Sequence, residues 1–198
     1  YNRRYFIQRI SEDFRSAFHD VISFMIFNMD DFHLFNELYG SMEGDAVLVS
    51  FARILDSTIG PSGSVCRYSG KEFAVFLPFC PPSKAAAYAD EIRTRFAGYI
   101  SEKYGIQPGG SLTFSCGICG YPMSASGVDE LQNRCGMAVF SAKQNGKART
   151  VVYSSSIDPD NEKGAARRKL SESCSQMIFA LTAAIDAKDH YTFNHSQA

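Results

Sequence analysis

The sequence predicts an α/β or α+β sandwich, in which helices flank a mixed sheet with a βαββαβ core. Short apolar runs of strand length alternate along the chain with longer segments of helical periodicity. Most of these runs are far apart, whereas two are joined by a tight Ser-Gly turn in "RYSGKEFAVFLP". A chain of 198 residues is also long enough to bury roughly 70% of the surface that it exposes when unfolded.

The first half of the chain supplies three helices and three strands. Residues 2–19 place apolar side chains at helical spacing, and residues 21–29 form a nearly continuous apolar run, typical of a central strand buried on both faces. Residues 30–60 predict a short helix, a glycine-bearing turn and a longer amphipathic helix. The runs 64–68 and 72–78 are the two strands of the hairpin.

The second half continues the alternation. A Pro-Pro pair precedes a helix predicted over 83–100. A strand over 109–122, a helix over 128–146 and a last strand over 148–154 follow. These elements complete a sheet whose long connections are helical.

The end of the chain predicts a boundary between domains. The polar stretch 155–165 contains Pro159 and predicts a linker. One domain therefore spans 1–154, and helical periodicity resumes within 166–198 as the first helix of a second domain that is cut short.

Composition and charge argue against several functions. A net charge of -1 offers no electrostatic footprint for nucleic acid or an anionic membrane. No apolar run approaches the ~20 residues of a spanning helix and no signal-peptide pattern opens the chain, so we expect a cytoplasmic protein. Because the chain begins without Met, we expect a piece of a longer polypeptide, in which a membrane or sensor segment can precede it.

Cys116 and Cys119 have the spacing of a redox or zinc motif. Both lie in the strand predicted over 109–122, where residues three apart point to opposite faces. We therefore expect the two sulfurs to diverge and the thiols to be structural, as buried free cysteines usually are.

Polar residues that follow the strand 21–29 form the first candidate site. Asn28, Asp30 and Asp31 offer oxygen ligands for a divalent cation. Phe32 and His33 begin the next helix, where backbone amides suit a phosphate.

Two further pairs suit a nucleotide. Asn36 and Asp45 present the donors and acceptors that read a purine edge. Lys143 and Lys147 are four apart at a helix end and can meet a polyphosphate. Taken singly, each group also fits a solvated surface: Asp45 fits a helix N-cap after Gly44, and the lysines fit a helix C-terminus.

The order and spacing of these groups resemble those of the GGDEF domain, the family of diguanylate cyclases that condense two GTP molecules into cyclic di-GMP. The resemblance runs from residue 1 to about 154. It rests on "YNRRYF", "NMDDFHLFNELYGSMEGD", "RYSGKEFAVFLP", "TFSCGIC" and "AVFSAKQNGKART". It implies a palm-like nucleotidyl-cyclase sheet surrounded by helices, and an activity that needs two domains facing each other with one GTP each.

The resemblance implies that Asn36 and Asp45 read guanine and that phosphates lie near the start of the following helix and near two lysines. The phosphate positions are Phe32, His33, Lys71, Lys143 and Lys147. His33 replaces a lysine of the family, and Lys147 replaces an arginine, so a planar bidentate donor becomes a point charge.

Both positions that hold Mg²⁺ in the family are changed. Asn28 replaces an aspartate, Lys71 replaces the acidic third residue of the signature hairpin, and Ser69 replaces its first glycine, whereas Gly70 and Glu72 remain. In the family the cations neutralise the triphosphate and help activate the attacking 3'-hydroxyl. Losing even about 4 kcal/mol of that stabilisation slows the reaction roughly a thousandfold, so we expect no bound Mg²⁺ and negligible cyclase activity.

The resemblance leaves one other route to a metal site. Asp30, Asp31 and Glu72 are near enough in the family pattern to recruit Mg²⁺ in another geometry. Lys71, however, places a positive charge where the cations belong and disfavours them.

The resemblance carries two further expectations. The product-inhibition motif R-x-x-D of the family has Gly60 and Gly63 at its key places, so feedback binding of cyclic di-GMP there is not expected. The tail "ALTAAIDAKDHYTFNHSQA" resembles the start of an HD-GYP domain, a metal-dependent cyclic di-GMP phosphodiesterase, with His195 at an early histidine.

These observations favour a guanine-nucleotide-binding module, able to form a homodimer, that regulates a covalently attached HD-GYP phosphodiesterase. Two alternatives remain open. One is residual diguanylate cyclase activity, and the other is a purely structural dimerisation spacer.

Overall fold

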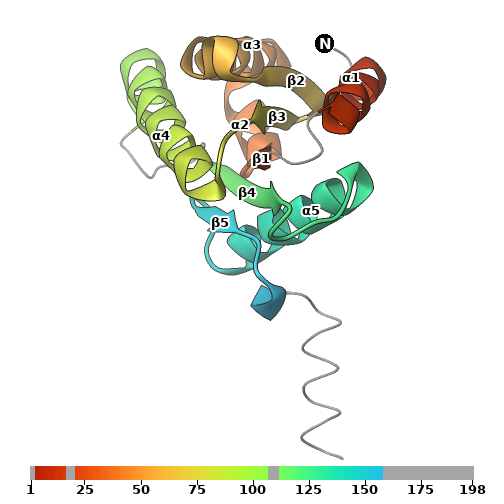
Figure 1. Ribbon diagram of the computed structural model, residues 1–198. Helices are drawn as coiled ribbons and strands as arrows, with labels where there is room; N and C mark the ends of the chain where they lie inside the picture. Colours follow the sequence, from red (N-terminus) through yellow and green to blue (C-terminus); the bar gives the residue numbers. More distant parts are fainter. Residues whose placement is uncertain (1–2, 17–20, 107–111, 158–198) are drawn as a thin grey trace, which may run out of the picture. The chain divides into compact units, whose positions relative to one another are not determined.

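A five-stranded mixed sheet lies at the centre of the fold (Figure 1). The computed structural model describes residues 3–16, 21–106 and 112–157; the linker, the predicted helix within 166–198 and His195 lie outside them, apart from the first linker residues. The strands are arranged in the order β2-β3-β1-β4-β5, which confirms the predicted fold class.

The central strand β1 (Ile22–Met29) is antiparallel to both of its neighbours, β3 (Glu72–Pro78) and β4 (Phe114–Tyr121). Strand β2 (Ser64–Ser69) pairs with β3 as the predicted hairpin, and the short β5 (Thr150–Val152) runs parallel to β4. Every residue of β1 is buried, as its continuous apolar run predicts.

Helices cover both faces of the sheet (Figure 1). On one face, α3 (Ser41–Ile59) and α4 (Pro82–Tyr104) pack against Met25 and Phe27 of β1. On the other, α1 (Arg3–Ser16) and α5 (Val128–Gln144) pack against Phe24 and Ile26. The alternation of β1 side chains between two cores is the physical reason that its run is unbroken.

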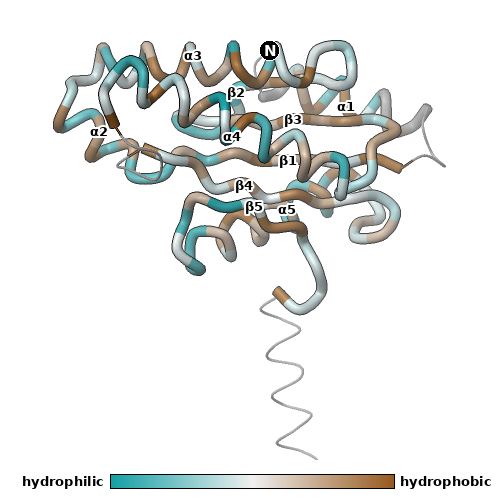
Figure 2. The backbone as a smooth tube through the Cα atoms, turned by 90° about the vertical axis from the view of Figure 1, so that its left-hand side faces the viewer, coloured by the Kyte–Doolittle hydropathy of each residue, from teal (hydrophilic) through white to brown (hydrophobic). Residues whose placement is uncertain are grey.

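Short elements complete the chain. Helix α2 (Phe32–Tyr39) directly follows β1 and packs on α3, and single turns of 3-10 helix lie at Gly60–Ser62 and Ser155–Ile157. The backbone tube in Figure 2 is largely hydrophobic along β1 and β3 and alternates along α3, which is the pattern of a helix with one buried face.

Two local expectations from the sequence are wrong. Helix α3 begins at Ser41 after Gly40, so Asp45 lies inside the helix and does not cap it. The hairpin turn consists of Gly70 and Lys71, because the pairing register shifts between Arg67 and Ser69 and moves the turn by one residue.

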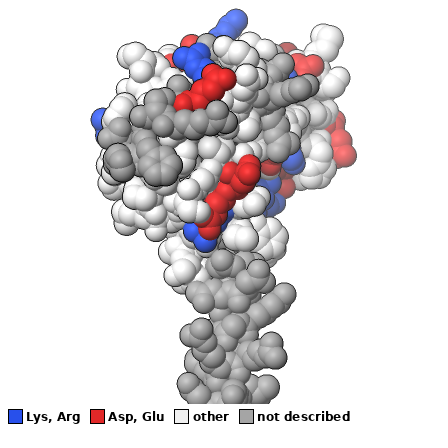
Figure 3. Space-filling model, turned by 45° about the vertical axis from the view of Figure 1, so that its right-hand side comes forward, with Lys and Arg blue, Asp and Glu red and all other residues white. Residues whose placement is uncertain are grey.

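The surface shows no concentration of one charge on the face drawn in Figure 3, where acidic and basic side chains lie in small mixed groups. In the described ranges, no helix is long and apolar enough to cross a membrane.

The cysteine prediction is confirmed. Cys116 packs in the core under α3 and α4, whereas Cys119 packs in the core under α1 and α5, so the two sulfurs lie on opposite faces of β4. Both thiols and that of Cys135 are fully buried. Burial raises the pKa of all three thiols, that of Cys119 to about 11.

These buried thiols are expected to resist alkylation in the native protein, because a raised pKa leaves almost no reactive thiolate until the pH approaches it. N-ethylmaleimide at mildly alkaline pH, followed by peptide mass spectrometry, should label Cys116, Cys119 and Cys135 only after denaturant is added. Rapid native labelling of these peptides, with far-UV circular dichroism unchanged, would contradict the buried assignment.

Candidate functional site

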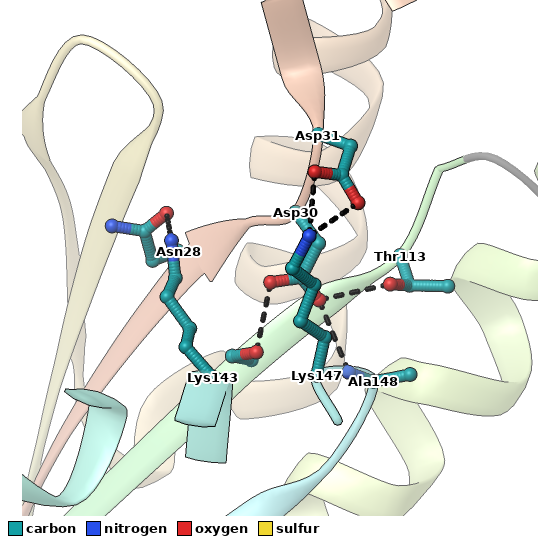
Figure 4. Close-up of polar contacts among 8 residues, drawn as sticks. Asn28, Asp30, Asp31, Thr113, Lys143, Lys147 and Ala148 are labelled. Carbon is teal, nitrogen blue, oxygen red and sulfur yellow. Dashed lines mark hydrogen bonds and ion pairs between the residues drawn. The ribbon is translucent and has the colours of Figure 1, made fainter. Parts of the chain in front are cut away.

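The polar end of β1 lies at the middle of the candidate site, where it meets residues from the start of β4 and from α5 and the loop after it (Figure 4), and Glu72 joins it from the hairpin. Asn28 accepts a hydrogen bond at Oδ1 from Lys143 Nζ at 2.7 Å and donates from Nδ2 to Glu72 Oε1 at 2.6 Å. The other carboxylate oxygen of Glu72 accepts from Ser69 Oγ at 2.6 Å. A continuous chain of hydrogen bonds thus runs from α5 through β1 to the signature hairpin.

Asp30 has a different role from its neighbours, because its side chain is buried and fully hydrogen-bonded. Oδ1 accepts from Ser115 Oγ at 2.8 Å, and Oδ2 accepts from Thr113 Oγ1 at 2.8 Å and from the backbone N–H of Ala148 at 3.1 Å. Asp30 therefore joins β1 to β4 and to the loop after α5. A buried carboxylate with three donors is a structural group.

Asp31 faces outward and forms an ion pair with Lys147 (Figure 4). Both carboxylate oxygens accept hydrogen bonds from Lys147 Nζ, at 2.7 and 2.8 Å. Asp31, Lys147 and Ala148 all have left-handed backbone conformations, with φ of 49°, 58° and 47°. Three such residues at one place are uncommon outside glycine and occur mainly where a site requires them.

The charges of this site shift one another's pKa values. The hydrogen bond from Lys147 lowers the pKa of Asp31, and the same contact raises the pKa of Lys147. The pKa of Lys143 is lowered, first by burial and next by the positive charge of Lys71. Lys71 and Lys143 are therefore close enough to oppose each other's charge.

Lys71 lies in the turn between β2 and β3, beside the end of β1. Its backbone carbonyl accepts a hydrogen bond from the N–H of Met29 at 3.2 Å. Within the described residues, its ammonium has neither a hydrogen-bond acceptor nor an ion-pair partner. Of Lys71, Lys143 and Lys147, Lys71 is the one whose ammonium makes no hydrogen bond or ion pair in the described residues, although its charge helps to lower the pKa of Asp31.

The structure places the two predicted guanine-reading residues at the corner between α2 and α3. Asn36 lies one turn beyond Phe32 on α2, and its amide packs against Gly44, the residue before Asp45. The Oδ1 atom of Asn36 is buried, and no donor in the described part of the chain reaches it. Asp45 is exposed on α3.

The other residues predicted from the sequence lie at the start of α2 and around the turn between α3 and β2. Phe32 begins α2 and packs partly against the core, while His33 next to it is exposed. Gly60 and Gly63 flank the turn between α3 and β2, so neither carries a side chain that can hold a ligand.

The oxygen atoms near the hairpin do not fit Mg²⁺ as they stand. Asp30 is saturated by three donors, both oxygens of Glu72 accept hydrogen bonds, and Asn28 Oδ1 accepts from an ammonium. A hard cation needs several free oxygens. Across the described ranges, no group of three or more His, Cys, Asp or Glu side chains is placed to hold a metal.

Sequence reasoning missed the partners of Asp30, namely Thr113, Ser115 and Ala148. Two of them are hydroxyl residues at the start of β4, and the third contributes only its backbone. The one available signal was polar residues at 113 and 115 in an otherwise apolar strand.

Comparisons with known proteins place these features in a family. The family model described as "Diguanylate cyclase, GGDEF domain" matches residues 1–149. The chain is 29% identical over 140 residues to Diguanylate cyclase A of Treponema denticola and 33% identical over 130 residues to Diguanylate cyclase DgcM of Escherichia coli. These matches cover 70% and 66% of this chain but only 37% and 30% of the relatives.

A solved structure agrees with the sequence matches. The active GGEEF domain of a diguanylate cyclase from Vibrio cholerae superposes with a TM-score of 0.70 at 25% identity. The superposition covers 77% of this chain and 97% of that domain. The sheet, its helices and the hairpin therefore have the fold of that domain.

Proposed function

The chain belongs to the GGDEF family of diguanylate cyclases, and we propose that this member binds GTP or another guanine nucleotide without Mg²⁺ and forms little or no cyclic di-GMP. The relatives carry the name of an enzyme. GGDEF domains normally use Mg²⁺. The proposal departs from that activity at the two positions where the family has acidic side chains, Asn28 and Lys71.

One observation carries the proposal: the chain of hydrogen bonds Lys143–Asn28–Glu72–Ser69. Asn28 brings no charge and is already bonded on both sides of its amide. Lys71 and Lys143 place two ammonium groups near it, and the pKa of Lys143 is lowered first by its burial and next by the positive charge of Lys71. In this proposal two ammonium groups, that of Lys143 held by Asn28 and that of Lys71 without a partner in the described residues, take the electrostatic place of a divalent cation.

The proposed binding mode uses this chain's own donors. Lys71, Lys143 and Lys147 would contact the phosphates, and Asn36 with Asp45 would contact the guanine edge. The Oδ1 atom of Asn36 is packed against Gly44 and has no donor in the described residues, which is costly, so the amide would gain a partner if it turned outward to a guanine N–H. Phe32 and His33 would line the path between the two ends.

The proposed role is regulatory. A domain that binds a nucleotide without turning it over can report the nucleotide's concentration to an attached domain, which we propose is an HD-GYP phosphodiesterase. Dimerisation of the domain is a further part of this proposal, since the family's chemistry needs two copies.

Calorimetric titration of GTP, in Mg²⁺ and in EDTA, tests the proposal. Binding is expected in both conditions with closely similar affinity, and the Asn36→Ala variant is expected to weaken it about tenfold, since a lost hydrogen bond to a ligand costs ~1–2 kcal/mol. Ser57→Ala, an exposed change on α3, is the matched control. Binding only with Mg²⁺, or steady production of cyclic di-GMP, would replace this proposal with an active cyclase, and no binding in either condition would leave a structural spacer.

A further inference from the structure

The ion pair between Asp31 and Lys147 engages one of the three lysines that the proposed nucleotide site requires. We propose that Asp31 competes with phosphate for Lys147. Its carboxylate holds the ammonium group of Lys147 until a nucleotide phosphate displaces the carboxylate. This inference rests on the proposed function and adds a regulatory element to the same site.

The backbone leaves the Asp31 carboxylate available for this role. Asp31 is the N-cap of α2, a position where an aspartate side chain normally accepts a hydrogen bond from the first turn. Here its left-handed conformation turns the side chain away, and it makes no side-chain cap hydrogen bond. The carboxylate instead reaches across to the loop after α5.

The contact is built so that it can exchange. The side chains of Asp31 and Lys147 are 36% and 45% exposed, so water reaches both charges. An exposed ion pair contributes little net free energy, whereas a phosphate offers the ammonium more charge and more acceptor oxygens. The neighbouring Asp30, buried with three donors, has no such freedom.

Asp30 and Asp31 are both candidate metal ligands by residue type, and their contacts in the structure distinguish them. Asp30 stabilises the fold, while Asp31 lies at the rim of the candidate site and occupies the ammonium group of Lys147. A ligand that engages Lys147 must overcome both the existing ion pair and the repulsion between Asp31 and its own phosphate. A ligand without phosphate meets neither cost.

Replacing the carboxylate by an amide isolates this effect. Asp31→Asn removes the charge, and asparagine tolerates the left-handed conformation that the position requires. GTP is expected to bind the variant about fivefold more tightly than wild type, while guanosine binding is unchanged. Asp56→Asn, in the exposed last turn of α3, removes the same charge elsewhere and should bind like wild type.

A double-mutant cycle assigns the gain to Lys147. In a Lys147→Ala background, which weakens GTP binding by itself, Asp31→Asn is expected to improve GTP affinity by less than twofold. Equal GTP affinities of wild type and Asp31→Asn, or a gain undiminished by Lys147→Ala, would overturn the role of Asp31 alone. If neither protein binds GTP or guanosine, the proposed function fails, and the competitor role fails with it.

Discussion

Restoring both acidic positions, by Asn28→Asp and Lys71→Glu together, is expected to raise the rate of cyclic di-GMP formation by about two to three orders of magnitude. The reason is electrostatic. The double change removes the turn's ammonium and adds two carboxylates, which fit a hard cation, in place of a neutral amide and a positive charge. A gain of ~3–4 kcal/mol in transition-state stabilisation corresponds to this change in rate.

Single variants and a metal-binding readout sharpen this experiment. Asn28→Asp alone leaves the ammonium of Lys71 in place, and Lys71→Glu alone leaves the amide of Asn28. Each single variant should therefore raise the rate of cyclic di-GMP formation less than the double variant does. Ser69→Gly removes only the hydrogen bond to Glu72 Oε2 and adds no carboxylate, so it should also gain less than the double variant. Manganese binding should appear with the double variant. A variant that binds manganese tightly but makes no product would show that metal ligands were not the missing part.

Gly117→Ala is expected to destabilise the domain by about 2–4 kcal/mol, because α5 packs directly on the backbone of β4 there. A Cβ at this position would lie 2.4 Å from the carbonyl oxygen of Cys135 and 2.6 Å from the backbone N of Val139. Backbone atoms of a helix cannot move singly, so the whole of α5 must shift. Lys143 moves with it, and GTP binding should weaken as well.

Urea unfolding followed by circular dichroism measures this loss as a lower midpoint at an unchanged slope. Gly136→Ala is the matched control, since it lies in the same helix and a Cβ there meets no atom within 4 Å. That change should stabilise the domain slightly, by up to about 1 kcal/mol, because alanine favours a helix. A urea midpoint for Gly117→Ala equal to that of wild type would mean that α5 packs less tightly on β4 than the distances at Gly117 imply.

Local patterns were sufficient for most of the fold. The apolar run at 21–29 predicted β1 because a strand buried on both faces has no polar alternation. The diverging pair Cys116 and Cys119 followed from strand geometry alone. The two errors have different causes: α3 begins at Ser41, a turn earlier than an Asp45 cap implies, whereas the hairpin turn differs because the strand register shifts by one residue.

The candidate site was predictable in membership but not in roles. Asn28, Lys143 and Lys147 were named from their spacing, and the structure gathers them at one end of β1. Asp30 and Asp31 were treated as equivalent, although adjacent residues at a strand end point in different directions. Only their partners distinguish them. Asp30 accepts hydrogen bonds from residues 113, 115 and 148 and is structural, whereas Asp31 pairs with residue 147 and is exchangeable in our proposal.

By itself, the sequence determined the fold class, the family resemblance and the residue types at the candidate site, because these depend on composition and local periodicity. The tertiary structure decided the contacts of those residues: the bond from Lys143 to Asn28, the bond from Asn28 to Glu72, and the pairing of Asp31 with Lys147. These contacts join residues more than forty positions apart. Their existence depends on sheet register and helix packing, which no local pattern encodes.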